Sequence, residues 1–154
     1  MDFRAFIIKG CVALCAVLPV YPIAPLQQQG IEGVARRITG NRMPSPKYHP
    51  GPPAGTHTTI CIFALTNQNQ VTNAGPAGLY SAVHTNLVRQ EDTDDSGHFR
   101  ILLPPGTYSV FTKKGQLFYA TRRDEKNNIA PVEVLPGKIT RVDCSVESEH
   151  TAVY

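Results

Sequence analysis

Apolar residues after position 30 recur at every second position or in short runs. Such alternation is typical of β-strands, whereas an amphipathic helix repeats its apolar positions every three to four residues. Sustained helical spacing is absent from this sequence. The pattern therefore predicts an all-β domain of about seven short strands, at residues 31–38, 58–65, 98–103, 107–111, 116–121, 131–135 and 139–146.

Polar and proline-containing segments separate the expected strands. Residues 41–57 carry a cluster of prolines, which cannot donate the hydrogen bonds of an interior strand. Residues 66–78 and 122–128 are polar, and glycine and proline interrupt the first of them. All three segments are expected to be loops. The pattern in residues 79–89 leaves strand and loop open.

Short motifs mark the expected turns. The motif Thr93–Gly97 combines Asp and Ser side chains, which hydrogen-bond locally, with a glycine that accepts a positive φ. The motif Pro104–Gly106 is expected to close a hairpin between residues 98–103 and 107–111. Further turns are expected at residues 114–115 and 136–137.

Residues 1–24 differ from the rest of the chain. Arg4 and Lys9 supply early positive charge, and residues 11–20 are apolar and are followed by a proline-containing, polar stretch. A basic start, a short apolar run and a polar exit are typical of a secretory signal. We therefore expect a signal peptide or N-terminal anchor at residues 1–24 and one folded domain at residues 30–154. The expected location is exported: periplasmic, outer-membrane-associated or secreted, with lipidation of Cys11 or Cys15 left open.

Composition agrees with a folded domain and argues against nucleic-acid binding. Hydrophobic residues make up 42% of the chain and charged residues 18%, a balance typical of globular domains. The net charge is only +3, and the basic residues are spread along the chain. A nucleic-acid interface would need clustered Lys and Arg with interleaved aromatic residues.

Two cysteines fall within the expected domain, Cys61 and Cys144. An exported chain with an even number of cysteines can form disulfides. Cys144 alternates with Val142 and Val146, so all three should point inward from one strand. A Cys61–Cys144 disulfide and two unpaired buried thiols both remain open on the sequence.

One stretch resembles a known family. The residues Asp94-Asp95-Ser96-Gly97-His98-Phe99 and Leu103-Pro104-Pro105-Gly106-Thr107-Tyr108-Ser109-Val110 are similar to the signature of carboxypeptidase regulatory-like domains. Those domains are transthyretin-like, or prealbumin-like, β-sandwiches of about seven strands. The resemblance implies structural roles for Gly97, Pro105, Gly106 and Tyr108, the last with a buried ring and a hydrogen-bonded hydroxyl group.

The mature chain further resembles a group of small exported bacterial proteins. The supporting segments are 40–44, 127–132 and 151–154. The resemblance implies a domain of the cell envelope. It does not imply an activity, since one fold serves many functions.

Enzymatic signatures are missing from the sequence. It contains no His-x-x-Glu pair of a metallopeptidase, no closely spaced His-x-His pair of the dioxygenases that share this sandwich, and no Gly-x-Ser-x-Gly. The histidines are scattered, at positions 49, 57, 84, 98 and 150. We therefore expect no catalysis, no cofactor and no metal site, and a metal-dependent enzyme on this fold is the lowest alternative.

Surface recognition is the function that remains. Loops on a rigid sandwich commonly bind partners, which makes Asn41 and Tyr48 of the proline-rich loop and Asn127 and Asn128 of the later polar loop the candidate binding residues. The expected partner is an unknown protein or glycan of the cell envelope. The alternatives are ordinary loops whose Asn side chains cap turns, and a structural part of an envelope assembly.

Overall fold

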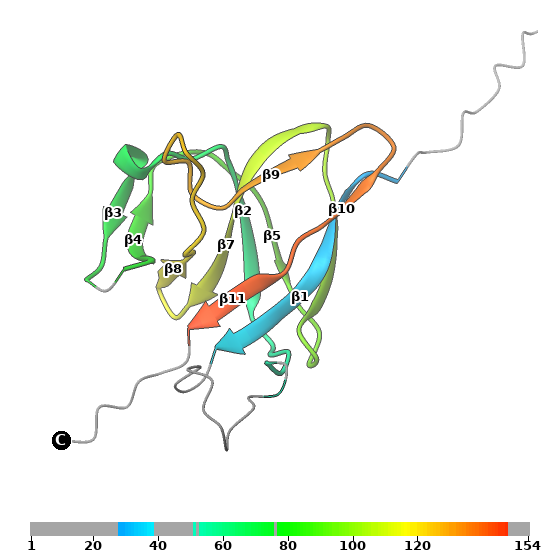
Figure 1. Cartoon of the computed structure of the whole chain (residues 1–154), viewed down its shortest axis with the longest axis horizontal. Coiled ribbons are helices and arrows are strands. Elements are labelled where there is room, and N and C mark those ends of the chain that lie inside the picture. The colour runs from blue at the N-terminus through cyan, green and yellow to red at the C-terminus, as the bar shows by residue number, and fades with distance from the viewer. Residues whose placement is uncertain (1–27, 39–50, 52, 76, 148–154) are drawn as a thin grey trace, which may run out of the picture.

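The computed structural model describes residues 28–38, 51, 53–75 and 77–147. Within them, a four-stranded and a seven-stranded β-sheet pack face to face as a sandwich (Figure 1). The all-β prediction is therefore confirmed. Asn41, Tyr48, most of the proline-rich loop and the segment 1–24 lie outside the described residues.

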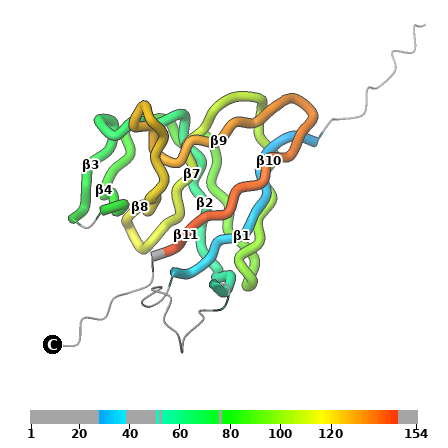
Figure 2. Tube along the Cα trace, in the orientation of Figure 1, coloured from blue at the N-terminus to red at the C-terminus, as the bar shows by residue number. Residues whose placement is uncertain are grey.

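The small sheet is built around β1 (Gly30–Ile38). On one side β6 (His98–Leu102) pairs with it antiparallel. On the other side β10 (Ile139–Arg141) and β11 (Cys144–Glu147) pair with it in parallel, one after the other. Figure 2 shows the first and last described strands running side by side.

The large sheet is ordered β3-β4-β8-β7-β2-β5, with β9 beside the first half of β7. Its central strands are β2 (Thr59–Ala64) and β7 (Gly106–Lys114). The others are β3 (Val71–Asn73), β4 (Leu79–Val83), β5 (Leu87–Asp92), β8 (Leu117–Tyr119) and β9 (Pro131–Val134). A short 3-10 helix, η1 (Gln68–Gln70), precedes β3.

The main core lies between the sheets and follows the alternation of the strands. Its residues include Ile31, Ile60, Ile62, Ile101 and Val110, all 4% exposed or less. Full burial of such a side chain stabilises the fold by roughly 1.5–3 kcal/mol. On β6, buried core residues alternate strictly with exposed residues along the strand.

A second core covers the opposite face of the large sheet. Cys61, Phe63 and Phe111 point to this face, where Tyr80 and Phe118 pack against them. Phe63 contacts Phe111 and Phe118 edge to face, with ring centroids 5.5 and 5.4 Å apart. Strand β2 is buried on both faces, which explains why its sequence is a continuous apolar run.

The hairpin predicted at Pro104–Gly106 is wrong. Strand β6 pairs with β1, whereas β7 pairs with β2, β8 and β9, so this motif carries the chain from one sheet to the other. Alternation identifies a strand but not its partner. The hydroxyl group of Tyr108 donates a 2.8 Å hydrogen bond to the carbonyl oxygen of Pro104 and holds this crossing.

One loop assignment also differs from the structure, since residues 66–78 contain η1 and β3. Residues 79–89, which the sequence left open between strand and loop, hold β4 and the start of β5. The single strand expected at 139–146 is divided into β10 and β11. Between them a side-chain oxygen of Asp143 accepts a 3.2 Å hydrogen bond from the backbone N–H group of Val34 on β1. With these additions the described residues form eleven strands, more than the seven expected.

Candidate functional site

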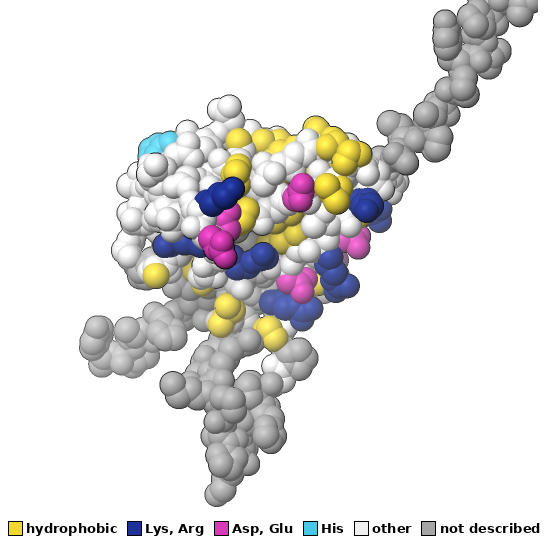
Figure 3. All heavy atoms as spheres, turned by 45° about the horizontal axis from the view of Figure 1, so that its top comes forward, with side chains coloured by type: hydrophobic (Ala, Val, Ile, Leu, Met, Phe, Trp, Pro, Cys, Tyr) yellow, Lys and Arg dark blue, Asp and Glu magenta, His cyan; other side chains and the backbone are white. Residues whose placement is uncertain are grey.

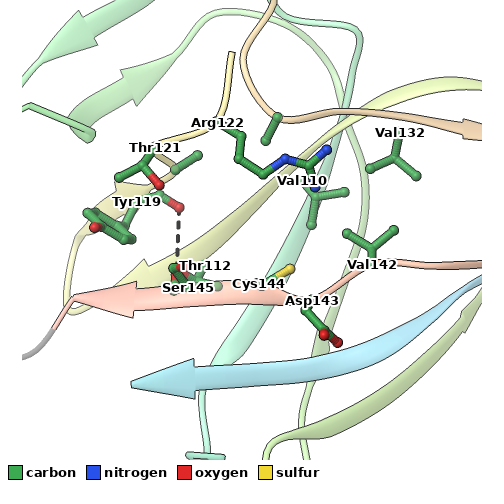
Figure 4. Close-up of a pocket in the computed structure, with 12 residues that line it drawn as sticks. Val110, Thr112, Tyr119, Thr121, Arg122, Val132, Val142, Asp143, Cys144 and Ser145 are labelled. Carbon is green, nitrogen blue, oxygen red and sulfur yellow. Dashed lines mark hydrogen bonds between the residues drawn. The ribbon is translucent and has the colours of Figure 1, made fainter. Parts of the chain in front are cut away.

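A groove opens along one side of the sandwich, where the two sheets do not pair. On the small sheet its wall is the segment Val142–Ser145, and on the large sheet it is Tyr119–Arg122. Val110, Thr112 and Val132 form the floor (Figure 4). A neighbouring hollow continues the groove toward the turn between β9 and β10; it shares Arg122, Val132 and Val142 and adds Pro131, Glu133, Leu135, Thr140 and Arg141.

Two threonine hydroxyl groups bracket the groove. At one end, Thr140 donates to the carbonyl oxygen of Glu133 at 2.7 Å and so joins β10 to β9. At the other end, Thr112 lies 3.1 Å from the carbonyl oxygen of Ser145 and joins β7 to β11. The sheets are therefore held at both ends, and the groove lies between the two contacts.

Arg122 lines the groove without an ion-pair partner among the described residues. Arg141 borders the neighbouring hollow, but it alternates along the chain with the inward-facing Thr140 and Val142 and lies opposite Glu32, so its side chain is on the outer face of the small sheet. The Arg122 backbone is fixed, because its carbonyl oxygen accepts the N–H group of Ala130 at 2.8 Å. In Figure 4 its side chain reaches into the groove. Asp143, by contrast, lies 3.9 Å from Arg36, which balances part of its charge.

The groove also contains a thiol, Cys144, which is half-buried. Burial raises its pKa to about 12, although the positive charge of Arg122 opposes the shift. The thiolate is the nucleophilic form of cysteine. Cys144 is therefore an apolar wall residue at neutral pH.

Of the two alternatives that the sequence left open for Cys61 and Cys144, the structure has the unpaired thiols and not the disulfide. Both residues are free thiols. Ile60 and Ile62 face the main core, against which Cys144 packs, and Cys61 between them points to the opposite face of the sheet. Because side chains alternate along a strand, the β-sheet itself separates the two sulfur atoms.

Of the candidate binding residues that the structure describes, Asn128 is held by side-chain hydrogen bonds within its own loop and to the loop before η1. Its amide nitrogen donates to Asp124 at 2.8 Å, and its amide oxygen accepts from Asn67 at 3.2 Å. Asn127 has a positive φ of 62° and an exposed side chain. Asn128 thus caps a turn, as the ordinary interpretation expected, and neither residue lines the groove.

The remaining surface shows charges of both signs. On the outer face of the small sheet, Glu32 lies 4.0 Å from Arg100, and His98 is near Asp94 at 3.8 Å. Figure 3 shows hydrophobic side chains on one face of the molecule, interspersed with basic and acidic groups. Within the described ranges, no three His, Cys, Asp or Glu residues gather as a metal site would require.

No helix in the described part of the chain is long and apolar enough to span a membrane.

Sequence reasoning did not identify the groove residues as a site. Alternation predicts that Val110, Val132 and Val142 point inward, but it does not show that the sheets separate above them. Arg122 stands in a polar loop, where an arginine carries no signal of its own. The missing information is which strand edges remain unpaired.

Comparisons with protein-family models, with curated proteins and with solved structures find no match to this chain. The resemblance to carboxypeptidase regulatory-like domains therefore stays a prediction.

Proposed function

We propose that the protein is an exported, non-catalytic binding module that holds a partner of the cell envelope in the groove between its two sheets. The observation that carries the proposal is the combination of an apolar floor with the guanidinium group of Arg122, which has no ion-pair partner among the described residues. A cleft with an apolar lining and a few polar groups is the usual form of a binding site.

The polar groups in the groove favour binding over catalysis. The Cys144 thiol is protonated at neutral pH. The Thr112 hydroxyl group is hydrogen-bonded to backbone oxygens. A nucleophile needs an adjacent base or a lowered pKa, and neither group has one.

Export and family type are supported by the sequence. The segment 1–24 has the order of charge and apolar residues typical of a secretory signal. The stretch from Leu103 to Val110 resembles carboxypeptidase regulatory-like domains. The Tyr108 hydroxyl group makes a hydrogen bond to Pro104 as the resemblance implies, whereas its ring is only partly buried.

A structural role in an envelope assembly is the second candidate. It would use a free sheet edge, and β5 is such an edge with exposed Leu87 and Val88. However, the register of β5 against β2 shifts beside these residues, and Arg89 and Glu91 follow them. Irregularity and charge protect an edge from pairing with other chains, so β5 is the weaker candidate.

The proposal is tested by photo-crosslinking in the cells that produce the protein. Leu135, at the rim of the groove, is replaced by p-benzoylphenylalanine, and Leu102, at the far edge of the small sheet, serves as the control. The two leucines are 41% and 48% exposed. We expect a discrete adduct from position 135 alone. Equal adducts from both positions, or none from position 135, would contradict the proposal.

A further inference from the structure

We infer that one end of the sandwich rests on a lipid bilayer. This apolar end is the one at which the described chain begins, and it carries Leu65, Leu87, Val88, Leu102 and Leu135. The inference goes beyond the proposed function, because it names a second contact surface and the orientation of the domain. It is carried by the exposed side chains, by the hydrogen bonds of Gln29 and by the sequence before Gln28.

The strand register brings these five residues to the same end of the sandwich. On the small sheet, β6 ends where β1 and β10 begin. On the large sheet, β2 and β9 end where β5 and β7 begin. The segment 103–105 joins β6 to β7, so the ends of the two sheets coincide. Leu65 follows β2, Leu87 and Val88 begin β5, Leu102 ends β6, and Leu135 follows β9.

These five are all the large apolar side chains that are strongly exposed among the described residues, between 39% and 51%. Pro104, Pro105 and Pro136 add exposed apolar surface in the same turns. A single exposed leucine is ordinary on a protein surface, but exposed apolar surface gathered in one place marks a contact with a protein or a membrane. Figure 3, which turns this end toward the viewer, shows hydrophobic side chains gathered near the start of the described chain.

Gln29 ties two turns of the apolar end to the beginning of β1. Its carbonyl oxygen accepts the N–H group of Leu103 at 3.1 Å, and its side-chain oxygen accepts the N–H group of Gly137 at 3.0 Å. Leu102 and Leu135 lie one and two residues from these contacts. The two leucines are therefore held beside the point at which the chain enters the sandwich.

The sequence before Gln28 favours a bilayer as the partner of this end. The apolar run at residues 11–20 ends eight residues before Gln28, and eight extended residues span at most about 29 Å. A bilayer that holds this run as an uncleaved anchor would therefore keep the apolar end within that distance of its surface. A planar partner also suits side chains that come from both sheets.

The charged groups at the apolar end set which side lies deepest. Leu65 shares a hollow with Asp124 and Glu125, and it is costly to place a carboxylate in lipid. Lys138, three residues after Leu135, is exposed and has the charge that anionic headgroups attract. Leu102 and Leu135 should therefore insert more deeply than Leu65.

The apolar end should orient a tethered domain and bind a free one only weakly. A single acyl chain gives marginal, reversible membrane binding, and two half-exposed leucines bury less apolar area than such a chain. The groove lies along the side of the sandwich, so contact of this end with a bilayer leaves the groove accessible.

The first experiment uses tryptophan fluorescence, because the chain contains no tryptophan. Leu102→Trp, Leu135→Trp and Leu65→Trp are compared with Gln116→Trp, an exposed position in the turn between β7 and β8 at the opposite end. The full chain is mixed with an excess of vesicles of phosphatidylethanolamine and phosphatidylglycerol whose acyl chains are brominated. We expect a shift to shorter wavelength and loss of most of the fluorescence at positions 102 and 135, a smaller loss at 65 and none at 116.

The second experiment tests whether the contact is apolar. In the Leu102→Trp protein, Leu135→Glu should restore most of the fluorescence, whereas Gln116→Glu, which changes the net charge equally, should not. Circular dichroism shows that the variants are folded. Unquenched fluorescence at positions 102 and 135, equal quenching at position 116, or quenching that Leu135→Glu does not change would overturn the inference. A shift that grows with protein concentration in the absence of vesicles would assign this end to a second copy of the chain and would also overturn it.

The bilayer contact and the groove are tested separately. In the photo-crosslinking experiment a lipid adds little mass at either position, which distinguishes it from the partner adduct expected at position 135.

Discussion

At the scale of the residue, Gly97 is a position that does not tolerate a side chain. Its φ is +81°, and a Cβ atom there would lie 2.4 Å from the carbonyl oxygen of Ala35 and 2.7 Å from the nitrogen of Thr56. Gly97 ends the turn that brings the chain from β5 to β6, so a shift here disturbs the pairing of β6 with β1.

We expect Gly97→Ala to lower the free energy of unfolding by about 1–3 kcal/mol, because backbone strain and overlap with backbone atoms combine. Urea titration measures the change. Gly51→Ala is the matched control, since a Cβ atom at Gly51 has nothing within 4 Å. Equal stability of the two variants would show that the turn is not as tightly packed as described.

Tyr108 allows a test of the crossing between the sheets. Tyr108→Phe keeps the ring and removes the hydrogen bond to Pro104, and we expect a loss of about 1 kcal/mol. Tyr80→Phe is the comparison, because its hydroxyl group has only a 3.4 Å contact with Arg123 and should matter less. Thermal denaturation of both variants measures which of them loses more stability, and a larger loss for Tyr80→Phe would contradict this account.

The two cysteines should react slowly in the folded protein. Burial raises the pKa of Cys61 to about 11 and that of Cys144 to about 12, so at neutral pH about one thiol in ten thousand or fewer is ionised. We expect both to be labelled by a thiol reagent only after unfolding. Peptide mapping locates the label, and a peptide pair linked through Cys61 and Cys144 would contradict the structure.

At the scale of the element, the strands could be predicted and their partners could not. The sequence of β6 was correctly interpreted because its apolar positions alternate, and that of β2 because it is a continuous apolar run. The pairing of β6 with β1 depends on residues far apart in the chain. The short β3 and β4 were missed or left open because their exposed positions weaken the alternation.

The carboxyl group of Asp94, in the turn before β6, should make the stability of the fold decrease at acid pH. Hydrogen bonds, first from the N–H group of His98 and then from Ser96, hold the pKa of Asp94 below its ordinary value of 3.8. A carboxyl group with a lower pKa in the folded state stabilises the fold above that ordinary value and loses this contribution as the pH falls below it.

We therefore expect Asp94→Asn to be less stable than the wild type near neutral pH and to differ less from it at about pH 3. Denaturation midpoints at the two pH values measure the difference. Asp95→Asn is the control, because no hydrogen bond to the Asp95 side chain is found among the described residues. A gap between Asp94→Asn and the wild type that is equally large at both pH values would exclude this linkage.

At the scale of the whole molecule, the central feature is that two sheets close a common core yet leave one side open. The candidate site could not be predicted from the sequence, since its residues come from β7, β8, β9 and β11 and from the segments after β8 and before β11. The sequence-based candidates Asn127 and Asn128 lie in the loop that follows Arg122 but do not line the groove, and Asn128 borders a separate hollow with Leu65 and Thr107.

The contact between Thr112 and Ser145 should control how firmly β11 is held. Thr112 is 2% exposed, and Thr112→Val leaves the Ser145 carbonyl oxygen without this donor. We expect a loss of about 1–3 kcal/mol and faster hydrogen exchange in β11. Thr121→Val, on the exposed rim of the same groove, should change neither quantity. Unchanged exchange in β11 would show that the contact does not join the sheets.

The most direct test of the account is co-sedimentation of the purified protein with the envelope fraction of the cells that produce it. Three proteins are compared: the wild type, Arg122→Glu in the groove, and Arg89→Glu, which changes the net charge equally away from the groove. The account predicts that the wild type and the second variant sediment and that the groove variant stays in solution. Equal sedimentation of all three, or of none, would contradict it.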